Sequence, residues 1–314
     1  MIKTFKTLEE QIDILKGKGL VINDEEFAKE VLLRENYFFI NGYRYPFVKS
    51  RNDKTYIEGV TFEELYSLFL FDRKLRNILF KNILLIENNL KSIISYQLSK
   101  KYGYKEKEYL KPENFDTDKV KKRQVSDLIS KMKRQIKNNA PVHSATKHYM
   151  DNYGYIPLWV LVKVLSFGVV VELFSILKKA DQEAILNIYG IAPEAFEVYL
   201  NILANYRNLC AHEDIVYENR TQKYIDDTVY HEELKIAKVD EEYEYGKNDL
   251  FALMIIFKNF LKKEEIDLLI EEIDDIISDL DVNLKSIPID KILDRMGFPN
   301  NWKELKSIDK RELF

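Results

Sequence analysis

Apolar residues recur every three or four positions along most of the chain, the spacing that places them on one face of an α-helix. The clearest stripe lies in the segment 265–280. It consists of Ile266, Leu269, Ile270, Ile273, Ile276, Ile277 and Leu280. This pattern predicts a helix whose apolar face packs in the core. The same region, 264–281, carries nine acidic residues and no basic one, and these either shield a functional site or only face water.

Two capping boxes mark the starts of helices in the first third of the chain. The sequence Thr-Leu-Glu-Glu at 7–10 predicts a short helix that ends at 17–19. The second box, Thr-Phe-Glu-Glu at 61–64, opens a segment without Gly or Pro that runs to Tyr102, and Gly103 ends it. This segment is either one very long helix or two helices that meet at a kink.

The remaining pattern predicts further helices and three less regular segments. Helices are expected over 24–35, 119–137, 158–179, 181–189, 193–212 and 249–261, with Pro157 at the first position of the third and Asp181 as the cap of the fourth. The aromatic segment 36–47 is expected to be a turn or loop packed on the core, and 55–60 a short strand. The polar segment 213–247 is expected to form either little regular structure or a small hairpin.

Composition supports an all-α class. There are only 10 Gly and 7 Pro, few for a protein of many short strands, and 46% hydrophobic with 32% charged residues is the balance of a soluble globular protein. We expect a multi-helix bundle in three regions: 1–60, a helical and loop region packed on the core; 61–220, the helical core; and 221–314, an acidic excursion followed by helices.

Several features predict a cytoplasmic protein without metal or cofactor. The single cysteine, Cys210, excludes an internal disulfide framework and fits a reducing compartment. The first eleven residues contain no apolar secretory segment. The most apolar stretch, 156–177, contains Lys163 and Glu172, which favours a buried helix over a membrane span. The histidines are scattered, so no Cys/His cluster has the spacing of a zinc site.

Basic residues gather in one predicted helix although the net charge of the chain is −4. They are Lys119, Lys121, Lys122, Arg123, Lys131, Lys133, Arg134 and Lys137. Only Asp127 opposes them. The run is either a solvated helix face or a surface that follows the phosphates of a nucleic acid.

The segment 206–212 combines the side chains that RNA cleavage needs. Arg207 could hold a phosphate, His212 could move a proton near neutral pH, and Asn208 lies one helical turn before His212 on the same face. The alternative is a helix C-terminus at which a cation offsets the dipole and caps the last carbonyls.

Several motifs together make the chain resemble the Abi-like family of bacterial abortive-infection proteins, the AbiD/AbiF group, whose core is a HEPN-type helical domain. The resemblance spans roughly residues 26–306. It rests on the segments 40–47 (Ile-Asn-Gly-Tyr-Arg-Tyr-Pro-Phe), 70–76 with Ile86-Glu87 downstream, 157–160 with 165–168, 207–212, and 296–302. It implies a HEPN-like bundle with N- and C-terminal helical additions, and an RNA endonuclease that limits phage infection.

The resemblance also implies roles for individual residues. Arg207 and His212 correspond to the catalytic Arg-x(4–6)-His pair, Asn208 to the polar position after the arginine, and Arg220 to a downstream arginine. The acidic pair Glu213-Asp214 stands where the family has a basic or His-rich run. Residues five apart on a helix lie about 140° apart, so one motif does not present both groups together. We therefore expect activity from a homodimer that supplies two of each.

RNA needs no metal for cleavage because its 2′-OH is an internal nucleophile beside the phosphate. The RNA-binding candidates are Tyr43, Arg44, Arg73, Lys121, Lys122, Arg123, Lys131, Lys133, Arg134 and Arg220. Besides the RNA substrate, a small inhibitory or guide-like RNA is a candidate partner for the basic helix. The competing functions are a non-catalytic RNA-binding module and a partner protein of a separate nucleotidyltransferase toxin in a toxin–antitoxin system.

Structural roles compete with functional ones at several positions. Core packing is the alternative for the tyrosines around Arg44, and structural ion pairs are expected for Asp72 and Arg73. Glu87 on the long helix could form a buried salt bridge with Arg207. Core positions are expected for Trp159 and Trp302, and Cys210 is expected to be a buried filler without nucleophilic activity.

Overall fold

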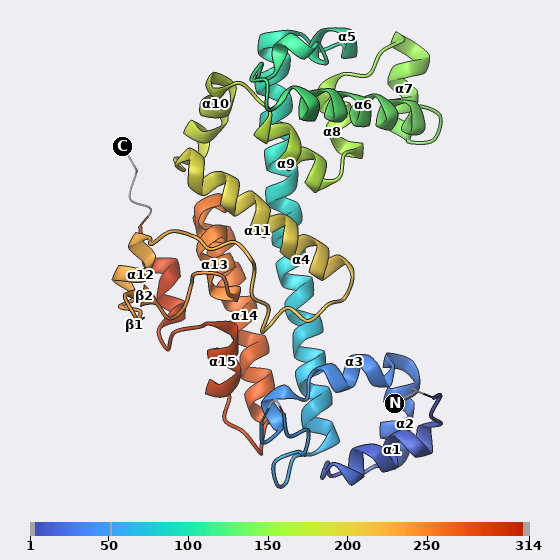
Figure 1. Ribbon diagram of the computed structural model, residues 1–314, viewed down its shortest axis with the longest axis vertical. Coiled ribbons are helices and arrows are strands. Elements are labelled where there is room, and N and C mark those ends of the chain that lie inside the picture. The colour runs from blue at the N-terminus through green and yellow to red at the C-terminus, as the bar shows by residue number, and fades with distance from the viewer. Residues whose placement is uncertain (1–3, 51, 310–314) are drawn as a thin grey trace.

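One long helix, α4 (Phe62–Tyr102), is the central spine of the protein (Figure 1). The computed structural model describes residues 4–50 and 52–309. The helix has 41 residues, roughly 60 Å of axis, and contains no break. The predicted capping box at Thr61 is present, and Gly103, with φ of 90°, ends the helix. The all-α prediction is confirmed, and of the two alternatives for this segment the single helix is correct.

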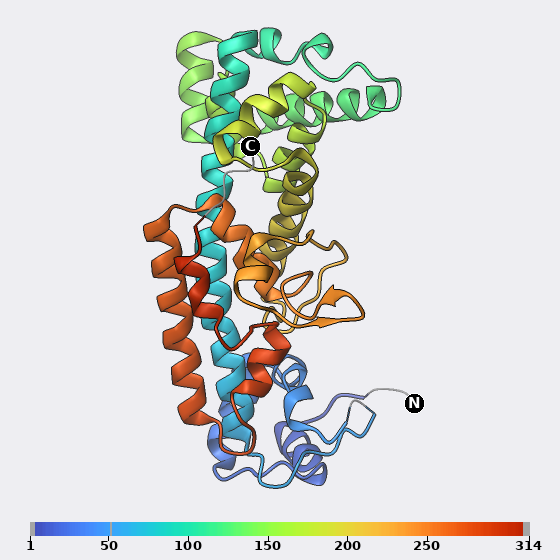
Figure 2. The same cartoon turned by 90° about the vertical axis from the view of Figure 1, so that its left-hand side faces the viewer.

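The N-terminal region packs on the first turns of α4 (Figure 2). It contains α1 (Leu8–Gly17), α2 (Glu25–Glu35), α3 (Tyr37–Gly42) and a 3₁₀ turn, η1 (Tyr45–Phe47). The prediction of a turn or loop over 36–47 was wrong for 37–42, which form α3, whereas 43–47 form turns packed on the core as predicted. The Asn36 side chain accepts from the Phe38 N–H at 2.9 Å and opens α3, whose Ile40 is buried. The expected strand at 55–60 is reduced to single bridges, Val48–Tyr56 and Val21–Thr61.

A second group of helices surrounds the C-terminal end of α4 (Figure 1). It contains α5 (Glu106–Tyr109), η2 (Pro112–Asn114), α6 (Lys122–Asn139), α7 (Ser144–Tyr153), α8 (Leu158–Val164), α9 (Phe167–Ser175) and α10 (Lys179–Tyr189). The single helix predicted over 158–179 is two helices. Leu165 and Ser166 are extended between them, in a stretch whose β-branched valines lower helix propensity. Pro157 is the N-cap of α8 and precedes its first residue.

Two further predictions in this group were wrong. The N-cap of α10 is Lys178, and Asp181 instead accepts hydrogen bonds from Lys101 and, at 2.6 Å, from the Tyr102 hydroxyl at the end of α4. Trp159 is 44% exposed and lies beside Tyr104, because it faces outward from α8. Trp302, by contrast, is buried as predicted. No helix among residues 4–50 and 52–309 is long and apolar enough to cross a membrane.

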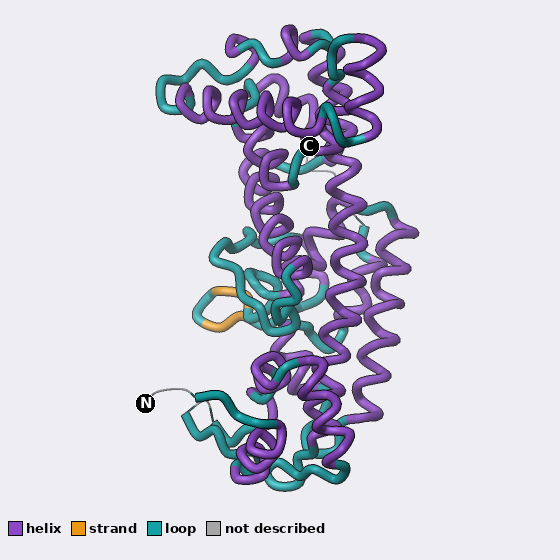
Figure 3. Tube along the Cα trace, turned by 90° about the vertical axis from the view of Figure 1, so that its right-hand side faces the viewer, coloured by secondary structure: helices purple, strands orange, loops and turns teal. Residues whose placement is uncertain are grey.

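The last third of the chain returns along α4. It contains α11 (Pro193–Ala211), α12 (Val229–Glu233), strands β1 (Lys238–Val239) and β2 (Glu242–Tyr243), α13 (Leu250–Phe260), α14 (Lys263–Asn283), α15 (Asp290–Met296) and η3 (Trp302–Ser307). The two strands pair antiparallel, so the excursion contains the hairpin that was one of its two expected forms (Figure 3). The apolar stripe of α14 is buried, as predicted.

The acidic face of α14 forms ion pairs with neighbouring lysines. Asp279 pairs with Lys74 at 3.0 Å, and Glu272 pairs with Lys81 at 2.6 Å, so α14 runs antiparallel to α4. Asp274 pairs with Lys303 of η3. These pairs lie at the surface and add little to stability, so the buried apolar stripe of α14 is what fixes it on the spine.

A buried carboxylate at the start of α13 provides a test of pH dependence. Asp249 caps the helix by accepting from the Ala252 N–H at 2.9 Å, and it also accepts from the Gly246 N–H. Burial raises the pKa of its carboxyl from 3.8 to about 6. Between those values the folded protein binds the proton more tightly than the unfolded chain, so this group makes the protein less stable as pH rises from about 4 to 6.

Asp249→Asn keeps the cap and removes the charge. We expect the free energy of unfolding of the wild type, measured relative to this variant by urea denaturation, to fall by up to about 3 kcal/mol across that range. Asp24→Asn, at the cap of α2, controls for the change of cap residue alone. If the wild type instead became more stable relative to Asp249→Asn as the pH rises, the folded protein would favour the ionised carboxylate, and the prediction would be wrong.

Candidate functional site

The segment singled out in the sequence forms the exposed C-terminal end of α11. Asn208 and His212 are exposed and lie one helical turn apart, and His212 is the C-cap of the helix. The His212 imidazole has no side-chain partner in the described part of the chain. Arg207 is turned toward α4 and its side chain is 31% exposed. The structure therefore leaves the histidine open to solvent and places the arginine at the junction of two helices.

Arg207 is held by a buried carboxylate of α4. Its Nε lies 3.9 Å from Glu87 Oε2, and Glu87 Oε1 accepts from Lys91 at 2.6 Å. The guanidinium also lies 5.7 Å from the centre of the Phe80 ring. Neither Arg207 Nε nor Glu87 Oε2 has a hydrogen-bond partner among residues 4–50 and 52–309. The Glu87–Arg207 salt bridge, which the sequence left open beside a catalytic role for Glu87, is thus present, and charge rather than hydrogen bonding links the two side chains.

The chain leaves α11 through a left-handed turn that has the 6→1 hydrogen bond of a Schellman motif, from the Asp214 N–H to Leu209 O, but not the usual glycine. The His212 N–H donates to Asn208 O, and the Asp214 N–H donates to Leu209 O, both at 3.0 Å. The residue between them, Glu213, has φ of 58°, a left-handed conformation that is unfavourable for a side chain with a Cβ. This tight closure turns the chain back toward α4 directly after the histidine.

A buried polar cluster then fixes the chain on α4. Asp72 accepts from Arg76 at 2.6 Å, from the Tyr43 hydroxyl at 2.8 Å and from the Tyr217 N–H at 2.9 Å. Arg76 also donates to Asp214 O at 3.3 Å. Burial raises the pKa of the Asp72 carboxyl to about 6, while the Arg76 charge opposes that rise. The segment after His212 is therefore held by side chains far away in sequence.

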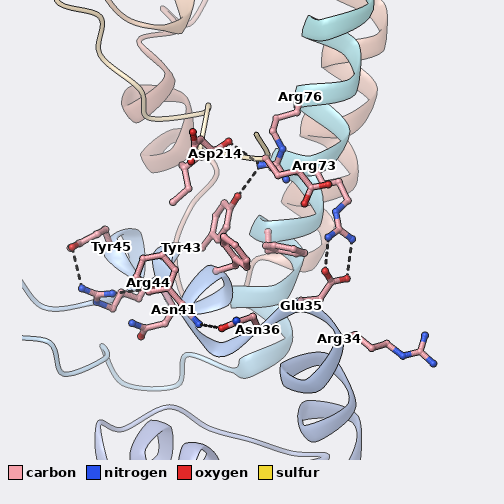
Figure 4. A pocket seen from close by; sticks show the side chains of 16 residues that line it. Arg34, Glu35, Asn36, Asn41, Tyr43, Arg44, Tyr45, Arg73, Arg76 and Asp214 are labelled. Atoms are coloured by element: carbon pink, nitrogen blue, oxygen red, sulfur yellow. Dashed lines mark hydrogen bonds and ion pairs between the residues drawn. The ribbon is translucent and has the colours of Figure 1, made fainter. Parts of the chain in front are cut away.

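A pocket of about 450 Å³ opens beside this segment (Figure 4). It lies between the α2–α3 corner, α4 and the residues that follow His212. Its lining includes Arg34, Arg44, Arg73, Arg76, Glu35, Asn41, Phe38, Phe39, Tyr45, Glu213 and Asp214. Five aromatic residues line the pocket, and three of its four arginines are paired with carboxylates, which leaves Arg44 as the arginine of this lining that is open to an anion.

The RNA-binding candidates of the N-terminal region have different environments. Tyr43 is buried, and its ring packs on Phe69 and Tyr217, so the expectation that it stacks on RNA does not hold. Arg73 forms a two-pronged ion pair with Glu35, so the expected structural pair is present. Arg44 lies at the mouth of the pocket, half-buried.

The basic residues of α6 lie away from the motif. Lys131 is bound to Glu172, and Lys121 to Asp116 and to the carbonyl of Ser175. Lys122 and Lys133 line a separate groove of about 750 Å³, while Arg123 and Arg134 are exposed. The helix packs on α8 and α9 near the far end of α4 (Figure 1). Arg220 donates to Arg295 O at 2.9 Å, at the end of α15.

Sequence reasoning expected a structural ion pair for Asp72 but did not identify Arg76 as its partner or the cluster that the two organise. Asp72 and Arg76 were visible as an i, i+4 pair of opposite charge, a spacing that favours contact on a helix. The exposed position of Phe38 and Phe39 had no such signal. No group of three or more His, Cys, Asp or Glu in the described ranges could hold a metal ion. Cys210 is buried, as expected, and burial raises the pKa of its thiol to about 12.

Comparison with known proteins gives a family match that covers most of the N-terminal two thirds of the chain. The model of the Abi-like protein family matches residues 30–218, more than half of the chain. The match includes the motif, the Asp72 cluster and the pocket, but the segment 296–302 lies outside it. No curated protein and no solved structure matches significantly. The chain belongs to the Abi-like protein family.

Proposed function

We propose that this protein is a metal-independent endoribonuclease of abortive infection, with Arg207, Asn208 and His212 in a HEPN-type site. Membership of the Abi-like family supports the defence role. The observation that carries the proposal is the open His212 imidazole at the end of α11, one turn from Asn208 and beside an arginine-lined pocket. A histidine that only capped its helix would need neither Asn208 one turn away nor a pocket beside it.

The chemistry assigns one task to each group. His212 takes the proton of the attacking 2′-OH or returns one to the leaving 5′-oxygen, since an imidazole can accept a proton on one ring nitrogen and donate one from the other. Arg207 holds the phosphate as negative charge develops on it. Its position favours this role, because Glu87 orients the guanidinium without consuming its terminal N–H donors. Asn208 supplies a neutral hydrogen bond from the same face as His212.

A second copy of the chain would complete the site. One motif supplies one histidine and one arginine on different faces, whereas cleavage requires an acid, a base and charge stabilisation. The outward face of α11 carries Asn201, Asn205, Asn208 and His212 in its C-terminal half, all exposed, while the exposed acidic residues of this face, Glu194 and Glu197, lie in its first turns. A solvated helix face ordinarily carries charged residues, while depletion of charge is typical of interface cores. We therefore propose a homodimer that pairs this face.

Cleavage of single-stranded RNA in EDTA tests the proposal. His212→Ala is expected to reduce the rate at least about a hundredfold, because a general acid–base group is lost. His148→Ala, at an exposed histidine of α7, is the matched control and should cleave like the wild type. Product ends carrying a 2′,3′-cyclic phosphate would identify 2′-OH attack. Light scattering on the same samples gives the oligomeric state, and an active monomer would contradict the dimer.

The alternative is a non-catalytic RNA-binding module. If neither the wild type nor His212→Ala cuts RNA but both bind it, that alternative is favoured and the nuclease proposal fails. Equal cleavage by both proteins would show that the activity does not depend on His212.

A further inference from the structure

The pocket beside the motif has the size and the lining of a nucleotide site. Its volume of about 450 Å³ lies within the range of small-ligand pockets. The catalytic assignment above uses none of its side chains. Three observations, on Arg44, on the exposed phenylalanines and on Asn41, indicate which kind of ligand the pocket binds.

Arg44 is fixed in place with donors to spare. It donates to Asn41 O at 2.8 Å and to the Tyr45 hydroxyl at 3.1 Å, and its guanidinium lies 4.5 Å from the centre of the Tyr45 ring (Figure 4). A guanidinium has five N–H donors, and these contacts use two. No carboxylate pairs with Arg44 in the described chain, so its charge and its remaining donors suit a phosphate.

Two phenylalanines next to Arg44 are exposed without an evident structural benefit. Phe38 is 75% and Phe39 is 51% exposed, and their rings meet edge to face at 5.9 Å. Adjacent exposed aromatic rings at a pocket mouth mark a binding surface, and base–aromatic stacking is their common use in proteins that bind single strands.

Polar groups at the wall suit the edge of a base. The Oδ1 atom of Asn41 is buried and has no hydrogen-bond partner among residues 4–50 and 52–309. Glu213 adds a carboxylate that repels phosphate on its side of the pocket. The other three arginines, Arg34, Arg73 and Arg76, are paired with Glu30, Glu35 and Asp72. The phosphate is therefore expected at Arg44 and the base against the rings and Asn41.

We propose that this pocket is a nucleotide subsite that holds one unpaired base of the RNA against Phe38 and Phe39, with its phosphate on Arg44. The inference rests on the proposed function in taking RNA as the substrate. A free nucleotide has the same chemistry, so the experiment must distinguish a strand from a mononucleotide.

Binding measured in the His212→Ala background separates this proposal from catalysis. Fluorescence anisotropy with a labelled single-stranded hexaribonucleotide is expected to show about tenfold weaker binding for Arg44→Gln, and a similar loss for Phe39→Ala. Lys263→Gln removes the same charge from an exposed position of α14 and should bind as tightly as the background. Both pocket positions are partly or largely exposed, so folding should be preserved.

The outcomes are distinct from those of the cleavage assay. Unchanged binding in both pocket variants would overturn the subsite even if the protein cleaves RNA. Weakened binding would support it even if no cleavage were found. Unlabelled AMP is the second probe. If AMP displaces the labelled hexamer at the same concentration as unlabelled hexamer does, the pocket is a free-nucleotide site and the strand proposal is overturned. If far higher AMP concentrations are needed, the strand proposal is supported.

Discussion

Asp72→Ala is expected to lower the free energy of unfolding by about 3–5 kcal/mol, because it leaves the buried Arg76 guanidinium without its counter-ion. The same change removes the acceptor for the Tyr43 hydroxyl and for the Tyr217 N–H. Urea denaturation followed by circular dichroism measures this loss. Since the cluster holds the segment after His212, cleavage should fall as well, even under conditions where the variant remains folded.

A surface pair of the same spacing provides the control. Asp127 lies four residues after Arg123 on α6, at 3.8 Å, with both side chains largely exposed. Asp127→Ala should change stability by less than about 1 kcal/mol, since exposed pairs contribute little. If Asp72→Ala cost no more than this control, the cluster could not be a main anchor of the site.

Gly297→Ala is expected to destabilise the protein by about 2–5 kcal/mol, from a left-handed backbone and a steric clash together. Gly297 follows α15 with φ of 75°, and a Cβ there would overlap the Asp249 carboxylate that caps α13. Neither backbone nor cap can move without breaking the hydrogen bonds of Asp249. Thermal and urea unfolding would both report the loss.

Gly190 separates the two contributions. It has φ of 64° at the end of α10, and a Cβ added there would meet nothing within 4 Å. Gly190→Ala should therefore show the conformational cost alone, about 1–2 kcal/mol. Equal losses at both glycines would mean that the contact with Asp249 contributes nothing.

Short-range sequence signals predicted the helix boundaries and the ion pairs that depend on neighbouring residues. The capping box at Thr61 and the glycine at 103 defined α4, and the acid-basic spacing within its sequence already contained the Asp72–Arg76 pair. The motif at the end of α11 was placed correctly because its helix is continuous from Pro193. These features depend on residues within a few turns of one another.

Long-range contacts determined the rest. The helix at 37–42 buries only Ile40, and it packs between α2 and α4, contacts that the aromatic composition of the segment does not predict. The pocket brings Glu35, Arg44, Arg73 and Glu213 together from three separate parts of the chain. Periodicity says which face of a helix is buried, but not which distant segment covers it.

The straight course of α4 also fixes the distance between the pocket and the motif. Arg76, at the pocket, and Glu87, which holds Arg207, lie eleven residues apart on one unbroken helix. Eleven residues are close to three full turns, so both side chains leave nearly the same face, roughly 16 Å apart along the axis. A helix without Gly or Pro cannot readily change that spacing. On the proposed function together with the proposed subsite, the cut would fall at a fixed number of nucleotides from the held base.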